Sequence, residues 1–133
     1  MKALKLAIWA ALLAGAAWAQ PQLGSRIPAW PGLWPRAESY LVAVYSFRCG
    51  DLSGLWKSLL STGLPIVAVN AGGVPTPAPA GLKLLRGAAA TKLSDLLEIG
   101  NYPTVLLIQG GRVLDYWSGS AQISRTNILG LLD

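Results

Sequence analysis

The chain contains one cysteine and no histidine, and the cysteine is the side chain best placed for chemistry. Cys49 follows an apolar run, residues 40–47, which is rich in valine and aromatic residues and too short to span a membrane. A run of this kind is typical of a strand that is buried on both faces. The next apolar residues have the spacing of one helical stripe and are Leu52, Leu55, Trp56, Leu59 and Leu60. Cys49 is therefore expected where a central strand passes into a helix.

That position favours a reactive thiol at Cys49. The unpaired N–H groups and the positive dipole end of a helix N-terminus stabilise a thiolate. The adjacent Arg48 acts in the same direction, whereas Asp51 opposes it by like charge. The alternative interpretation is a small, buried and inert cysteine of the core. We predict that Cys49 is a catalytic thiol, and the core alternative stays open.

The composition excludes most other chemistries. Without histidine and with a single cysteine, the chain has no zinc site of the usual type and no Ser-His or Cys-His pair. The pairs Gly72-Gly73 and Gly110-Gly111 are typical of turns and not of a phosphate-binding loop. The six carboxylates lie far apart in sequence and indicate no acid-base pair. We therefore expect no metal and no cofactor.

The first 19 residues have the pattern of a secretory signal. Lys2 and Lys5 form a basic start, residues 6–16 are apolar, and residues 17–19 offer a small-x-small cleavage site. We therefore expect an exported protein, periplasmic or secreted, that begins at Gln20 after cleavage and has no stable membrane span. The alternative is an N-terminal membrane anchor, which the shortness of the apolar run disfavours.

The charge of the exported chain limits its partners. Loss of Lys2 and Lys5 lowers the formal net charge from +5 to +3, and the remaining basic residues form no block or stripe. No nucleic-acid partner is expected. A lone cysteine in an exported protein pairs with another molecule, is buried, or remains a reactive thiol.

A Pro- and Trp-rich lead-in, residues 20–38, precedes a single domain, residues 39–133. Its four prolines remove amide donors and favour extended geometry, so an irregular segment is predicted. We expect Trp30 and Trp34 to fold back as a lid over apolar surface. The alternative is an exposed docking patch for a partner.

The domain is predicted to continue with a parallel strand-helix-strand unit. Pro65 precedes a second buried strand, residues 66–70, and Pro is tolerated at the start of a strand. A Gly- and Pro-rich surface loop follows at residues 71–81. Residues 82–86 form a further short strand in one interpretation, and their placement stays open.

A second helix is predicted after residue 90. Thr91 is expected to cap it, and its buried side is expected to comprise Leu93, Leu96 and Leu97. Gly100 suits a left-handed C-terminal cap.

The last part of the chain is predicted to form a hairpin and a helix. Residues 104–108 and 113–117 are the hairpin strands, and the Gly-Gly turn between them supplies positive φ. The final helix is expected to begin near Ser124 and to bury Ile128, Leu131 and Leu132.

Two segments of this sequence resemble the thioredoxin superfamily. The first is YSFRCGDL, residues 45–52, which is similar to the family's strand and active-site turn with a Cys-Gly-x-x core. The second is NYPTVLLIQGGRVLDYWSG, residues 101–119, which is similar to the family's Pro-Thr step, strand, Gly turn and final strand. The resemblance covers residues 39–133. It implies an α/β, thioredoxin-like three-layer sandwich, with a mixed central sheet of four or five strands and helices on both faces.

The resemblance also implies the residues of a site. In the family the proline of the second segment is cis and faces the active cysteine, so Pro103 would be cis and face Cys49. Pro103 would expose the backbone of Tyr102 for strand-like hydrogen bonds to an extended peptide. The candidate substrate-binding residues are therefore Arg48, Gly50, Tyr102 and Pro103.

The sequence departs from the family at three positions. Leu52 stands where the family has its second cysteine, and its apolar character makes it a core residue in the plain interpretation. Arg48 replaces the usual aromatic residue, and Ala43 replaces the buried acidic residue of many thioredoxins. Without a second thiol, no intramolecular attack can release a mixed disulfide.

Three hypotheses follow for the function. The first is an exported monothiol redox or thiol-trapping protein, whose Cys49 forms a mixed disulfide with a cysteine-containing protein or a small thiol and needs an external thiol for release. The second is a redox-inactive thioredoxin-fold module that docks a partner non-covalently around Pro103. The third is a disulfide-linked homodimer through Cys49. Whether the protein is an enzyme stays open.

Overall fold

The computed structural model describes residues 20–119 and 122–132, so the predicted signal, residues 1–19, lies outside the described residues. The described elements are β1 (Ser39–Tyr45), the short 3-10 helix η1 (Phe47–Cys49), α2 (Ser53–Leu60), β2 (Ile66–Asn70), β3 (Lys83–Arg86), α3 (Ala88–Leu96), β4 (Thr104–Gln109), β5 (Arg112–Ser118) and α4 (Arg125–Leu129). The fold is α/β, with the predicted strands at residues 66–70 and 82–86 both present.

A mixed sheet of five strands forms the centre of the molecule, in the order β3-β2-β1-β4-β5. β1 is parallel to β2, with Leu41 opposite Ile66, and β2 is parallel to β3. β4 is antiparallel to β1, with Val44 opposite Thr104, and β5 is antiparallel to β4. The parallel strand-helix-strand unit and the C-terminal hairpin are therefore both confirmed.

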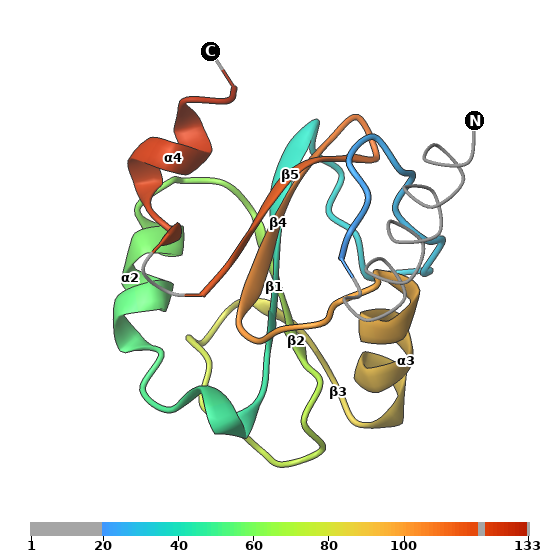
Figure 1. Cartoon of the computed structure of the whole chain (residues 1–133), viewed down its shortest axis with the longest axis vertical. Coiled ribbons are helices and arrows are strands. Elements are labelled where there is room, and N and C mark those ends of the chain that lie inside the picture. The colour runs from blue at the N-terminus through green and yellow to red at the C-terminus, as the bar shows by residue number, and fades with distance from the viewer. Residues whose placement is uncertain (1–19, 120–121, 133) are drawn as a thin grey trace, which may run out of the picture.

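Helices cover both faces of the sheet (Figure 1). α2 and α4 lie on one face, and α3 and the lead-in lie on the other. Side chains of β1 alternate between the two layers: Val42 and Val44 pack under α3, whereas Ala43 and Tyr45 pack under α2. This alternation with burial on both sides explains the unbroken apolar run of β1.

The lead-in is irregular, as predicted, and its tryptophans contact the core under α3. The indole Nε1 of Trp34 donates to the carbonyl of Pro28 at 2.7 Å, and its ring stacks on Tyr40 with centroids 5.9 Å apart. Trp30 is partly buried against the same cluster. Both tryptophans thus act as the predicted lid, and their indoles are engaged in the fold.

The predicted start and end of α3 are wrong. The helix begins at Ala88, after Gly87, and Thr91 lies within it; the Thr91 hydroxyl donates to the carbonyl of Ala71 at 3.1 Å. The left-handed residue after the helix is Glu98, with φ 58°, and not Gly100.

The predicted buried side of α3 is wrong at one position. Leu93 and Leu97 are buried, but Leu96 is 53% exposed. Ala90 and Ser94 also face inward, because residues 90, 93, 94 and 97 lie on one helical face. In α4, Ser124 caps the helix and Ile128 is buried as predicted, whereas Leu131 is 44% exposed.

Candidate functional site

Cys49 lies on a short turn between the central strand and α2. The turn begins at Ser46, whose hydroxyl accepts from the N–H of Arg48 at 3.3 Å, and the N–H of Cys49 donates to the Ser46 carbonyl at 3.1 Å. Cys49 is a free cysteine, partly buried against the core cluster under α2. The strand-to-helix position predicted from the sequence is therefore correct.

The N-terminus of α2 is engaged by a carboxylate. α2 begins at Ser53, so residues 50–52 separate it from Cys49. The N–H of Ser53 donates to Oδ1 of Asp51 at 2.9 Å. This bond, with a second from the Ser53 side chain, lowers the pKa of Asp51 below its ordinary value of 3.8. Asp51 therefore competes with Cys49 for the helix terminus, and a stabilised Cys49 thiolate stays a prediction.

Arg48 and Gly50 flank Cys49 and are both exposed. The Arg48 guanidinium carbon lies 5.6 Å from the ring centroid of Phe47, within the range of a cation-π contact. Gly50 has φ 74° and ψ −142°, a backbone conformation that side chains with a Cβ atom rarely adopt. These two residues form the exposed rim of the cysteine turn.

Leu52 ends this turn as a core residue. Its side chain is 5% exposed and belongs to the cluster under α2. The plain interpretation of Leu52 from the sequence is therefore confirmed.

Tyr102 and Pro103 lie at the same end of the sheet as the cysteine turn. β1 and β4 are antiparallel, with Val44 opposite Thr104, so the end of β1 lies beside the start of β4. The Tyr102-Pro103 peptide bond is cis, as the resemblance implied. The five predicted site residues therefore come from two segments that adjoin at one end of the central strands β1 and β4.

Hydrogen bonds fix the segment that holds Pro103. The hydroxyl of Thr104 donates to the carbonyl of Asn101 at 2.7 Å and lies 2.9 Å from Oγ of Ser118. The carbonyl of Pro103 accepts from the N–H of Gly119 at 2.9 Å. Pro103 itself is buried.

The Tyr102 side chain is held by a hydrogen bond, whereas its backbone groups have no partner among the described residues. The Tyr102 hydroxyl lies 2.8 Å from Oγ of Ser94, and the side chain is 40% exposed. Within residues 20–119 and 122–132, the N–H and C=O of Tyr102 form no hydrogen bond. These groups are the ones that an added strand would use.

The loop after β2 packs against the cysteine turn. The N–H of Ala71 donates to the carbonyl of Tyr45 at 2.8 Å, and the buried Asn70 side chain donates to the carbonyl of Val74 at 2.8 Å. Gly72 lies against Ser46 and Phe47. The sequence interpretation of residues 71–81 as a plain surface loop missed this packing.

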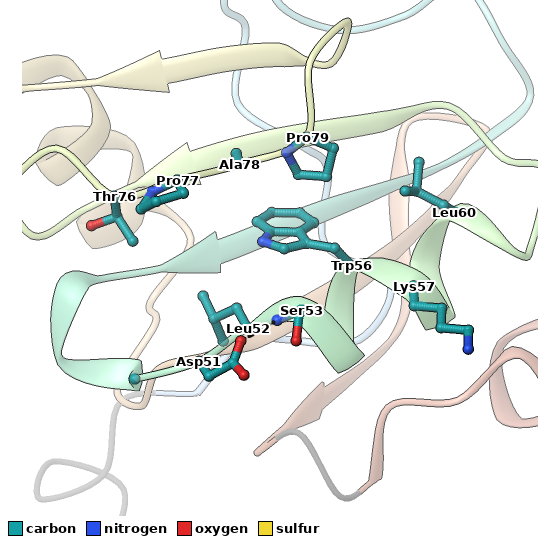
Figure 2. A pocket seen from close by; sticks show the side chains of 11 residues that line it. Asp51, Leu52, Ser53, Trp56, Lys57, Leu60, Thr76, Pro77, Ala78 and Pro79 are labelled. Atoms are coloured by element: carbon teal, nitrogen blue, oxygen red, sulfur yellow. Dashed lines mark hydrogen bonds between the residues drawn. The ribbon is translucent and has the colours of Figure 1, made fainter.

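A cavity of about 610 Å³ opens between this loop and α2 (Figure 2). It begins at Gly50 and runs along α2 past Trp56 to Leu60, and residues 76–79 form its other wall. Sequence analysis did not identify this cavity. The one available signal was the alternation of prolines at positions 75, 77 and 79, which is typical of an extended segment without N–H donors.

Among the described residues, no three acidic or cysteine side chains gather closely enough to share a metal ion. No helix in the same residues has the length and apolarity to cross a membrane. Comparisons of the chain with protein-family models, with curated proteins and with solved structures give no match.

Proposed function

We propose that this protein is an exported, thioredoxin-like monothiol protein that exchanges or traps disulfides through Cys49. The observation that carries the proposal is the adjacency of two segments at one end of the central strands β1 and β4. Cys49 follows β1, and residues 102–103 precede β4, the antiparallel neighbour of β1. One bound chain would then contact both the Cys49 thiol and the backbone of Tyr102.

The order of the elements supports the thioredoxin-like assignment. A central strand, a cysteine turn, a helix, a parallel strand, a second helix, a cis-proline step, a hairpin and a final helix follow one another as the resemblance implies. β3 is inserted before the second helix and extends the sheet at its outer edge. Export is proposed from residues 1–19 alone.

The proposed chemistry is thiol-disulfide exchange. The sulfur of Cys49 attacks one sulfur of a partner disulfide; a Cys49-partner disulfide forms, the partner's S–S bond breaks, and its second sulfur leaves as a thiol. Leu52 occupies the place of a resolving cysteine, so release needs an external thiol. That thiol attacks the partner sulfur, forms a new disulfide with it and returns Cys49 as a thiol.

The backbone of Tyr102 is proposed to hold the partner during this exchange. Its N–H and C=O would pair with an extended segment beside the partner's cysteine, as in strand addition. Arg48 is exposed at the rim of the same site and would contact the partner there.

Trapping with a disulfide peptide tests the proposal. The full chain is incubated with a peptide whose cysteine is joined to thionitrobenzoate, and the adduct is measured by intact mass. We expect one reductant-sensitive adduct per chain and none with Cys49→Ser, whose unfolding transition should be unchanged. An adduct that survives Cys49→Ser, or a folded wild-type protein that forms none, would contradict the proposal; the second result would favour the redox-inactive binding module.

A further inference from the structure

The cavity beside α2 is lined in part by the residue that follows the proposed reactive cysteine. Gly50, the chain neighbour of Cys49, belongs to its wall. From there the cavity runs under the loop that follows β2 (Figure 2). A partner joined to Cys49 through a disulfide would therefore lie beside the wall that Gly50 contributes.

The walls of the cavity are largely apolar, and Asp51, Ser53, Lys57 and Thr76 supply its polar side chains. On the α2 side, Trp56 extends its indole towards residues 76–79, as Figure 2 shows. On the loop side, Pro77 and Pro79 have no N–H to donate. An occupant of this space therefore gains contact area and little hydrogen bonding, which suits an aliphatic or aromatic side chain.

Trp56 is the fixed part of the cavity. Its side chain is only 6% exposed and makes an edge-to-face contact with Tyr45, with centroids 5.2 Å apart. Its indole N–H is buried and finds no acceptor among the described residues.

The two charged side chains that line the cavity do not favour a ligand of either charge. Asp51 and Lys57 both line the cavity, both are exposed, and their charges are opposite. The remaining lining on α2 includes Leu60, which is 50% exposed. Recognition in this cavity therefore depends on apolar contact.

We infer that the cavity is a specificity pocket for a large apolar side chain that flanks the cysteine of the partner. The inference rests on the proposed function, because Cys49 must form the disulfide that brings this side chain to the cavity. It names the substrate class: a disulfide-containing protein with leucine, isoleucine or phenylalanine next to the target cysteine.

Two activated peptides test the inference on the full chain. Both carry a cysteine joined to thionitrobenzoate, and the flanking residue is leucine in one and serine in the other. Cys49 attacks the peptide sulfur and thionitrobenzoate leaves as a coloured anion, which gives the second-order rate. We expect the leucine peptide to react about tenfold faster.

The loop supplies a matched pair of variants. Pro77 lines the cavity, whereas Pro75 in the same loop does not, and both are exposed. Pro77→Asp should reduce the preference for leucine to below about threefold, and Pro75→Asp should leave it intact.

Each outcome separates the two proposals. Equal and rapid reaction of both peptides would overturn the pocket and leave the redox function standing, as would a preference that survives Pro77→Asp. Absence of reaction with either peptide, in a protein that is folded, would overturn both.

Discussion

Gly72 lies so close to Ser46 that a Cβ atom added to Gly72 would be 2.9 Å from the Cβ atom of Ser46. The loop after β2 and the turn that leads to Cys49 are therefore packed against each other with no space for a methyl group. This contact fixes the start of the cysteine turn, at Ser46 and Phe47.

Gly72→Ala should therefore destabilise the protein. The added methyl group meets Ser46 and also the ring of Phe47 at 3.1 Å, and overpacking of this kind costs about 1–3 kcal/mol of the free energy of unfolding. Urea unfolding measures the change. Gly54→Ala is the matched control: nothing lies within 4 Å of its Cβ position, and alanine in α2 should add about 0.5 kcal/mol. Equal stability of the two variants would refute this packing.

Glu98→Gly should stabilise the protein. Glu98 follows α3 with φ 58°, in the left-handed region that glycine adopts without steric cost. Its side chain is exposed, so little contact is lost. We expect a gain of about 1 kcal/mol in the free energy of unfolding, measured in urea. A less stable Glu98→Gly protein would contradict the assignment of the helix end.

Tyr45→Phe should leave the protein as stable as before or more stable at neutral pH. The Tyr45 hydroxyl is buried and has no hydrogen-bond partner among the described residues, which is a cost that phenylalanine removes. The edge-to-face contact with Trp56 survives the change. A gain of up to about 1 kcal/mol is expected in urea unfolding. A loss above about 1 kcal/mol would reveal an unrecognised partner of the hydroxyl.

The same variant should change the alkaline limit of stability. Burial raises the pKa of Tyr45 above its ordinary value of 10.0. The folded state therefore holds the Tyr45 proton more tightly than the unfolded state. The contribution of this proton to the free energy of unfolding is complete below about pH 10 and is lost as the pH rises through the folded pKa. Burial also raises the pKa of Tyr40, which acts in the same direction. Between pH 9 and about 11.5, the wild-type protein should lose more stability than Tyr45→Phe; parallel curves would contradict this.

Asp51→Asn should accelerate reaction at Cys49. Asparagine keeps a side-chain oxygen for the N–H of Ser53, and the change removes a negative charge two residues from the thiol. The bond from Ser53 lowers the pKa of Asp51, so the carboxylate of the wild type is charged throughout neutral conditions. We expect a two- to threefold faster exchange with a neutral disulfide at low salt, a difference that shrinks at high salt. A slower variant would show that Asp51 supports the thiol.

The fold was predictable where one apolar pattern determined one element. The apolar runs of β1 and β2 were sufficient to predict these strands, because burial on both faces requires apolar residues throughout. The Gly-Gly turn before β5 was sufficient to predict the hairpin, because a positive φ favours glycine. The start of α3 was not predictable from the apolar stripe. Residues 88–90 are alanines, which favour a helix without marking a face, and they extend it before Thr91.

The site was predictable only in part, because one of its walls depends on tertiary contact. Cys49, Pro103 and their neighbours were identified from local sequence. The cavity was not identified, because it forms only where residues 76–79 lie across Trp56. The spacing of apolar residues in a sequence does not predict that a loop packs near a helix. The competition of Asp51 for the end of α2 likewise depends on the helix beginning at Ser53.

The reaction of Cys49 with iodoacetamide at pH 7 tests the central claim most directly. The rate is measured by intact mass on the folded full chain and on the same chain unfolded in urea, which supplies the intrinsic reactivity of this cysteine. A reactive site predicts that the folded protein is alkylated at least about threefold faster than the unfolded chain. A folded protein that is alkylated only as it unfolds would assign Cys49 to the core and contradict the account.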